Sequence, residues 1–128
     1  MERWRTPIRC YVSPADNNKI AKWYRGLLPQ EKADADAFLV NMRKIQIRDW
    51  VMPDYRRLKN GEGLGELRWF SENKNHRLLG FFMDGFWYAL VGCTHKKKVY
   101  NPHDALQTAK KYKGQVERGE VNTVEYDL

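Results

Sequence analysis

The stretch GELRWFSENKNHRLLGFFMDGFWYALVGCT, residues 65–94, decides the fold. It holds three runs of mostly apolar and aromatic residues, GELRWFS, HRLLGFFM and FWYALVGCT, each with the length and composition of a β-strand. Asp84-Gly85 separates the last two runs, and this dipeptide is a strong signal for a two-residue hairpin turn. Residues 73–75 (NKN) are the expected turn between the first two runs. The stretch therefore predicts a three-stranded antiparallel meander.

Amphipathic helices are expected on both sides of the meander. A strand over residues 8–13 opens the chain. Apolar residues then recur with the spacing of a buried helical stripe through residues 20–27, 35–45 and 106–116. A serine or asparagine followed by proline and aspartate has the residue types of a helix N-cap, and this pattern precedes the first helix at Ser13 and the third at Asn101.

The order of these elements predicts an α+β fold. It reads β-α-α-β-β-β-α, with two N-terminal helices packed on an antiparallel β-sheet and one C-terminal helix. The basic, glycine-rich residues 56–65 are expected to form a loop between the helical and the β-rich halves. Residues 1–119 fit a single domain. The acidic residues 120–128 are expected to form a loose tail or a short extra strand.

Composition narrows the class of partner and the compartment. The 128 residues include 23 Lys and Arg against 16 Asp and Glu, a net charge of +7, which favours a phosphate-rich partner or an acidic protein. Cys10 and Cys93 stand far apart, each in an apolar run, so we expect reduced core cysteines and no metal site. No apolar segment has the length of a signal peptide or a membrane span, which predicts a cytoplasmic protein with no membrane contact.

Assumed strand registers gather basic residues on one side of the sheet. If Asp84-Gly85 and Asn73-Lys74 are the turns, Arg77 lies opposite Gly92 and also opposite Phe70. One face of the sheet then carries Arg68, Arg77 and Lys96 beside aromatic rings. The same registers place Cys93 and His95 on the other, core-facing side.

Two interpretations of this basic face stand on an equal footing. Multidentate arginines beside flat aromatic rings suit the phosphates and unpaired bases of RNA. Alternatively, the two arginines form structural salt bridges with Glu66 or Asp84, and the lysines at 96–98 only coat an exposed edge.

Several motifs resemble those of RelE/ParE-superfamily toxins, in particular the HigB-like and phage-derived branch. GLGELRWF, residues 63–70, is similar to the Glu-Leu-Arg strand of that family, and Arg77 in HRLL sits where the branch keeps a strand arginine. KKKVYNP, residues 96–102, resembles its double lysine followed by a helix-starting proline. DALQTAKKYK, residues 104–113, is similar to its closing helix. The resemblance covers residues 7–119, although His76 precedes Arg77 where relatives commonly have a tyrosine.

The resemblance implies a RelE-like fold and the toxin of a type II toxin-antitoxin system. Such a toxin is an endoribonuclease, an mRNA interferase that cleaves mRNA, typically on the translating ribosome, and needs neither a metal nor another cofactor. It drives the RNA 2′-hydroxyl onto the adjacent phosphate, and a cognate antitoxin protein neutralises it. Two other functions stay open on the same scaffold: a ParE-like toxin that binds DNA gyrase, and a phage-derived binding protein without catalysis.

Candidate site residues follow from the chemistry of RNA cleavage, which needs a base, positive charge on the phosphorane and an acid. Arg68 and Arg77 suit only the electrostatic role, because arginine hardly ever deprotonates. Lys96 and Lys97 are candidates for charge stabilisation or for the base, and the candidates for proton transfer are His95 and Tyr100. The candidates for RNA binding outside the reacting centre are Arg56, Arg57, Lys59, Lys98 and Phe70, although a basic loop is more commonly just solvated.

Overall fold

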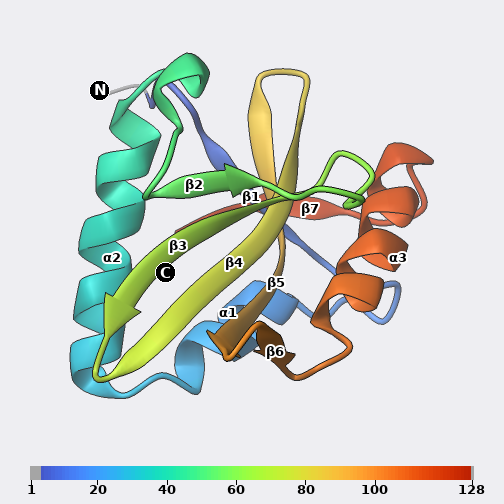
Figure 1. Ribbon diagram of the computed structural model, residues 1–128. Helices are drawn as coiled ribbons and strands as arrows, with labels where there is room; N and C mark the ends of the chain where they lie inside the picture. Colours follow the sequence, from blue (N-terminus) through green and yellow to red (C-terminus); the bar gives the residue numbers. More distant parts are fainter. Residues whose placement is uncertain (1–3, 128) are drawn as a thin grey trace.

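The computed structural model describes residues 4–127, which contain seven strands, three α-helices and one 3₁₀ helix (Figure 1). In chain order the elements are β1 (Ile8–Tyr11), α1 (Lys19–Arg25), α2 (Pro29–Lys44), the 3₁₀ helix η1 (Ile47–Asp49), β2 (Tyr55–Arg57), β3 (Gly65–Ser71), β4 (Lys74–Met83), β5 (Phe86–Lys96), β6 (Val99–Asn101), α3 (Ala105–Glu117) and β7 (Thr123–Glu125).

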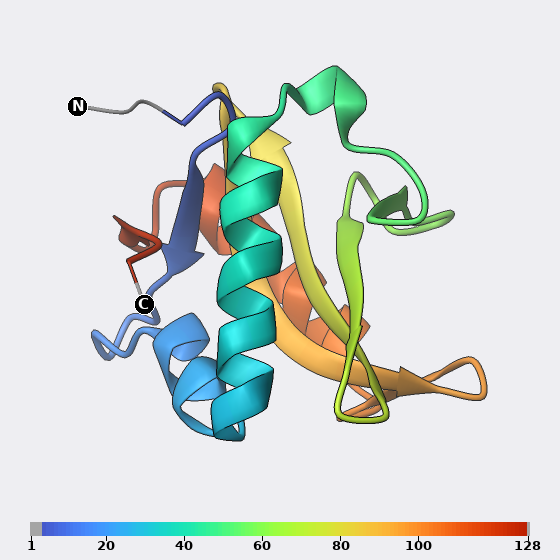
Figure 2. The same ribbon diagram turned by 90° about the vertical axis from the view of Figure 1, so that its left-hand side faces the viewer.

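The strands form one mixed sheet that helices cover on both faces. The strand order is β2-β3-β4-β5-β1-β7, and β6 pairs with the end of β5. β1 runs parallel to β5, and every other pairing among residues 4–127 is antiparallel. α2 lies along one side of the sheet and α3 on the other (Figures 1 and 2). The expected α+β class is therefore confirmed, and the sheet is antiparallel as expected except at the parallel β1–β5 pair.

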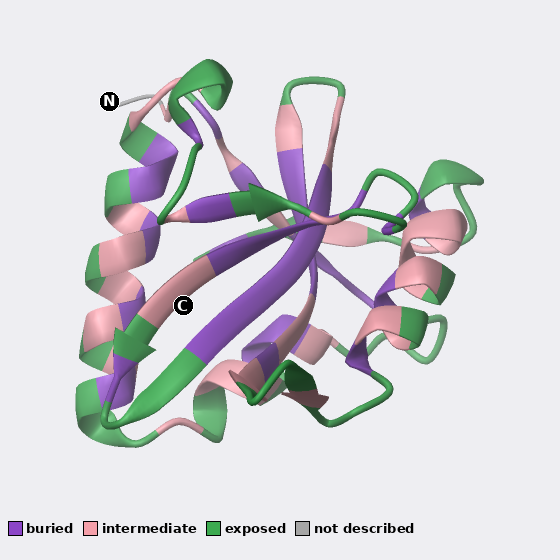
Figure 3. Ribbon diagram, viewed as in Figure 1, coloured by how far each residue is buried: buried purple, intermediate pink, exposed green. Residues whose placement is uncertain are grey.

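Two cores fill the space between the sheet and its helices. The first joins α1 and α2 to one sheet face and includes Ile20, Leu39, Leu67, Leu78 and Trp87. The second joins α3 to the opposite face and includes Leu79, Phe81, Leu90, Cys93 and Ala109. Burial ends along β3 and β4 toward their hairpin, where both strands turn green in Figure 3. On the α2 face this end stays covered, because Ser71 and Lys74 bond to Asp34 and Glu31 of α2.

The helix starts differ from the expected caps. Asn18, not Ser13, caps α1, because its side-chain oxygen accepts the backbone N–H groups of residues 20 and 21 at 3.1 and 2.9 Å. Ser13 instead accepts the backbone N–H of residue 17 at 3.2 Å in the preceding turn. Asp104 is the residue before α3, and Asn101 belongs to β6. Asn18 thus caps α1 through its side chain, whereas Asp104 makes no side-chain capping hydrogen bond.

The structure has three short strands besides the predicted ones. Two of them, β2 and β6, were not expected from the sequence, and for the third, β7, the sequence allowed either a tail or a strand. Residues 55–57 form β2, so Arg56 and Arg57 belong to a strand and not to a loop. β6 doubles back on β5 through a turn at Lys97 and Lys98, both with positive φ. Residues 123–125, for which a tail and a strand were both open, form β7 beside β1.

The registers of the meander also differ from the assumed ones. The first turn is Glu72-Asn73, so Arg68 lies directly opposite Arg77. The Asp84-Gly85 turn is as predicted. Farther along this hairpin, residue 79 pairs with 91 and residue 80 with 89, which leaves Leu90 as the extra residue of a β-bulge on β5. The bulge reverses which face the following residues occupy.

Cys93 and His95 consequently lie on the opposite face from the expected one. Cys93 pairs with Arg77 and packs in the second core, with α3, instead of the first. Cys10 and Cys93 are both buried free thiols, as expected. Within residues 4–127 no helix has the length and apolar character needed to cross a membrane.

Candidate functional site

Polar and aromatic side chains gather on the sheet face that α3 shares, in three rows that run across the strands. Residues paired across antiparallel strands point to the same side of a sheet. The outer row is Phe70, Asn75, His95 and Tyr100, the middle row contains Arg68 and Arg77, and the inner row contains Arg56 and Glu66. We call these eight residues the polar face. Two of these residues are buried, with Glu66 4% and Arg77 6% exposed, and Tyr100 packs against the second core beside α3. Phe70, at the outer edge, is 64% exposed.

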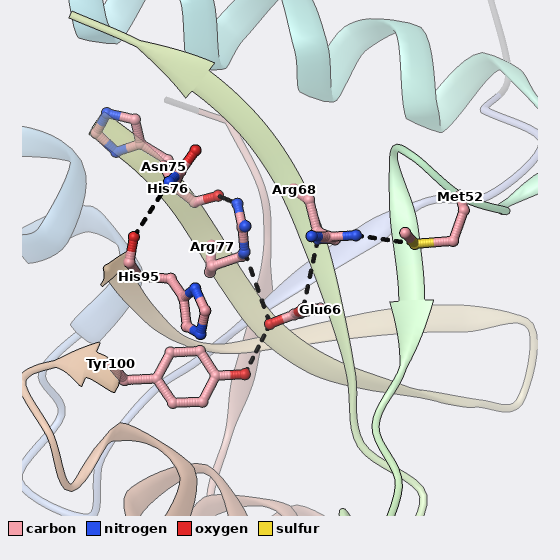
Figure 4. A network of polar contacts seen from close by, with 8 residues as sticks. All are labelled: Met52, Glu66, Arg68, Asn75, His76, Arg77, His95 and Tyr100. Atoms are coloured by element: carbon pink, nitrogen blue, oxygen red, sulfur yellow. Dashed lines mark hydrogen bonds and ion pairs between the residues drawn. The ribbon is translucent and has the colours of Figure 1, made fainter. Parts of the chain in front are cut away.

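Glu66 is the centre of the polar face. Its carboxylate accepts a hydrogen bond from the Tyr100 hydroxyl at 2.7 Å. The Nε atoms of Arg68 and Arg77 lie 3.5 and 3.8 Å from its two oxygens. The three side chains come from three strands and reach Glu66 from different directions (Figure 4). One carboxylate therefore holds two guanidinium groups and a phenol together.

The two arginines form ion pairs with Glu66 but no hydrogen bond to it. Separations of 3.5 and 3.8 Å are ion pairs, longer than an ordinary N–H···O hydrogen bond. Within the described residues, both Nε groups are buried without a hydrogen-bond partner. Arg77 Nη1 donates to the carbonyl oxygen of His76 at 2.9 Å, and Arg68 Nη1 contacts the sulfur of Met52 at 2.9 Å. Because a thioether is a weak acceptor, an anionic oxygen would be a better partner for Arg68.

Burial separates the roles available to the two arginines. The Arg77 side chain is 8% exposed and that of Arg68 is 22% exposed. Burial lowers the pKa of Arg77, while the Glu66 charge acts in the opposite direction. Arg68 is thus the arginine that an incoming ligand meets first, and Arg77 lies behind it.

The pKa values of His95 and Tyr100 are shifted in opposite directions. Their rings pack edge to face with centroids 5.2 Å apart, and both side chains extend toward Glu66 (Figure 4). Burial, followed by the positive charges of Arg77 and Arg68, lowers the pKa of His95, so its imidazole is neutral near pH 7. Burial and the hydrogen bond to Glu66 raise the pKa of Tyr100, so its phenol keeps its proton. A proton acceptor and a proton donor thus stand side by side.

The other predicted residues are divided between the polar face and the rest of the surface. Arg56, on β2, pairs with Glu66 on β3 and belongs to the polar face. Arg57, the next residue, points to the opposite side of the sheet. Phe70 belongs to the polar face and is 64% exposed. Lys59 is exposed in the loop before β3.

The lysine run does not join the arginines. Lys96 follows His95 in β5, so its side chain leaves from the opposite face of the sheet. Lys97 and Lys98 are exposed in the turn to β6. The expectation that Lys96 shares a face with Arg68 and Arg77 is therefore wrong, because the bulge at Leu90 shifts the alternation of β5 by one residue.

Glu66 is the central residue that sequence reasoning missed as part of a functional site. It was considered only as a salt-bridge partner, and the structure does pair it with both arginines. Its position two residues before Arg68 already places both side chains on one face of a strand. This spacing was the available signal. Asp84, the other partner considered, lies in the far hairpin turn.

An open hollow of about 570 Å³ adjoins the polar face at the β3 side. Its lining includes Met52, Pro53, Asp54, Arg68 and Phe70. Separately, among residues 4–127 no three His, Cys, Asp or Glu side chains gather where they could hold a metal ion.

The chain matches no protein-family model, and comparison with curated proteins and with solved structures gave no match.

Proposed function

We propose that the protein is a RelE-like toxin of a type II toxin-antitoxin system that cleaves mRNA, on translating ribosomes, without a metal. The observation that carries this proposal is the convergence of Arg68, Arg77 and Tyr100 on Glu66, with His95 alongside, on the sheet face that α3 shares. This arrangement offers the three things that attack by a 2′-hydroxyl requires: a base, fixed positive charge and an acid. The motifs that resemble the HigB-like branch include the same two arginines and agree with this proposal.

The two arginines bind the scissile phosphate. Two guanidinium groups facing one carboxylate leave one net positive charge for a bound phosphodiester, whose charge grows by one in the phosphorane transition state. The weakly partnered groups of Arg68 exchange the Met52 sulfur for a phosphate oxygen.

His95 takes the proton from the 2′-hydroxyl as the oxygen attacks phosphorus. The lowered pKa of His95 provides the neutral imidazole that this step needs. The bond from phosphorus to the 5′-oxygen breaks, and Tyr100 donates its proton to that oxygen. Protonated His95 or water then returns a proton to the phenolate. The products are a 2′,3′-cyclic phosphate and a 5′-hydroxyl.

Glu66 is a positioning residue in this scheme. Its carboxylate already accepts the Tyr100 hydroxyl and faces both arginines, so it fixes the acid and the two cations relative to one another. An exchange of roles, with Glu66 as base and His95 as acid, requires protonated His95 and predicts the opposite dependence on pH.

The test uses purified protein added to a translation extract, followed by mapping of new RNA ends. Wild type is expected to cut messages, and both Arg68→Ala and His95→Gln are expected to lower cutting by at least about 100-fold, since each removes one catalytic function. Arg25→Ala is the matched control, because Arg25 is an exposed arginine on α1, away from the polar face. Circular dichroism establishes that every variant is folded. Full cutting by Arg68→Ala would refute this site.

Induced expression in cells, followed by the same mapping of RNA ends, separates the alternative functions. The partner expected from the resemblance is an antitoxin, and an acidic segment of such a protein would complement the basic surface. Growth arrest with DNA damage and intact messages would point to a gyrase-binding toxin. Neither arrest nor cutting would point to a binding protein without catalysis.

A further inference from the structure

The hollow beside Arg68 has the composition of a site for one flat, partly polar group. It has a volume of about 570 Å³, and the residues that line it include Met52, Asp54, Phe70, Asn75 and the two arginines of the polar face. A hollow of this size suits a single small-molecule-sized group. It opens directly onto the site proposed for the scissile phosphate, so a strand held there would place a neighbouring nucleotide in or over the hollow.

Phe70 supplies a stacking surface. Its side chain is 64% exposed although it lies within a β-strand, and Met52 on the other wall is 57% exposed. The side chains of Phe70 and Met52 therefore remain in contact with water, although burying them would stabilise the fold. An aromatic ring and a polarizable sulfur are good partners for the face of a base.

Asp54 and Asn75 supply hydrogen-bond acceptors at the same hollow. The carbonyl oxygen of Asp54 accepts the backbone N–H of Arg68 at 2.8 Å, which fixes the Asp54 backbone against β3. The Asn75 amide nitrogen donates to the carbonyl oxygen of His95 at 3.3 Å, and this leaves its own oxygen to accept. A carboxylate accepts from the N–H groups of a base, and guanine offers two adjacent donors, N1–H and N2–H₂, whereas uracil offers one.

We propose that this hollow is a base-recognition site, in which a base next to the scissile linkage stacks on Phe70 and turns a donor edge toward Asp54, with guanine preferred over uracil. The proposal rests on the proposed function, since it assigns the sequence preference of that same cleavage. It makes Phe70 and Asp54 specificity residues, distinct from the groups that perform the chemistry.

The binding test uses two probes that the enzyme cannot cleave, 2′-deoxyguanosine 3′,5′-bisphosphate and 2′-deoxyuridine 3′,5′-bisphosphate. They carry a phosphate on either side of the sugar and lack the attacking hydroxyl. Binding is followed by intrinsic tryptophan fluorescence, to which Trp69 at the hollow contributes together with the four other tryptophans. Wild type is expected to bind the guanine probe more tightly than the uracil probe. Phe70→Ala should weaken the guanine probe on the order of tenfold, and Phe70→Tyr should restore binding. Asp54→Asn should reduce the guanine preference.

The control is Leu28→Ala, because Leu28 is a 54% exposed apolar side chain just before α2. Equal binding of both probes by wild type, or unchanged binding by Phe70→Ala, would overturn the base site. Cut-site mapping then separates the two proposals. If wild type cuts RNA and Phe70→Ala cuts the same sites equally well, the base site is wrong and the nuclease function stands. If wild type cuts nothing, the nuclease proposal fails, and the probe titrations alone decide whether the hollow binds a base.

Discussion

Replacing Glu66 with glutamine should destabilise the fold, because it removes the one negative charge between two arginines. Glutamine keeps the shape of the side chain and can still accept the Tyr100 hydroxyl through its amide oxygen. What it loses is the charge that faces Arg77, whose side chain is 8% exposed. An arginine buried without a counter-charge is costly.

The magnitude follows from burial and distance. Removing one partner of a buried ion pair costs about 3–5 kcal/mol, and the 3.8 Å separation of Arg77 from Glu66 favours the lower end of that range. The Arg68 pair is closer to a surface pair and contributes about 0.2–1 kcal/mol. We therefore expect Glu66→Gln to lose about 3 kcal/mol of unfolding free energy. For a chain of this length this loss corresponds to a fall of about 10 °C in Tm.

Urea unfolding followed by tryptophan fluorescence measures this loss. Glu62→Gln is the control, because Glu62 is exposed in the loop before β3, and it should stay within about 0.5 kcal/mol of wild type. Arg77→Met and the double variant Glu66→Gln/Arg77→Met complete a cycle in which the two losses should fall short of additivity by about 1–3 kcal/mol. A Glu66→Gln protein as stable as wild type, or strictly additive losses, would refute the network described here.

Three further predictions concern pH, the thiols and the bulge. In a cleavage assay, kcat/KM should rise with pH and reach half its plateau below pH 6.5, because His95 must be neutral and its pKa is lowered; a fall over that range would assign it as the acid. Burial raises the pKa of both Cys10 and Cys93 to about 12, so neither should react with a thiol reagent at pH 8 until the protein unfolds, and rapid labelling would contradict their burial. Gly80→Ala should cost at least about 2 kcal/mol in urea unfolding, because a Cβ there would collide with backbone and ring atoms of β5. Gly85→Asn, in an open turn with φ of 82°, should change stability by less than about 1 kcal/mol, and equal losses for both would contradict the bulge geometry.

The parts of the fold that local signals encode were predictable from sequence. Asp84-Gly85 forms the expected turn, and the three apolar runs form β3, β4 and β5. The helical stripes at 20–27 and 35–45 correspond to α1 and α2. Strands of three residues, such as β2, are too short to carry a period, and only their pairing partners define them.

The bulge and the arginine register depended on tertiary packing. Residues 86–93 are apolar nearly throughout, so their pattern contains no mark of where the strand changes face. The bulge at Leu90 lets Leu90 and Cys93 both pack against the α3 side and carries His95 to the polar face. The turn at Glu72-Asn73 instead of residues 73–75 then brought Arg68 directly opposite Arg77. The bulge alone exchanged Lys96 for His95 in the candidate site, because the shifted turn moves the β3–β4 pairing by two residues and leaves the faces of both strands unchanged.

The most direct test of the central claim is the chemistry of the cut ends. A message carrying a single 2′-deoxynucleotide at a mapped cut site should be spared there and cut elsewhere. The ordinary message should yield 2′,3′-cyclic phosphate and 5′-hydroxyl ends with wild type and with Arg25→Ala, and no ends with Arg68→Ala. Cutting at the 2′-deoxy position, or 3′-hydroxyl ends, would contradict the claim that the polar face cleaves RNA through its own 2′-hydroxyl.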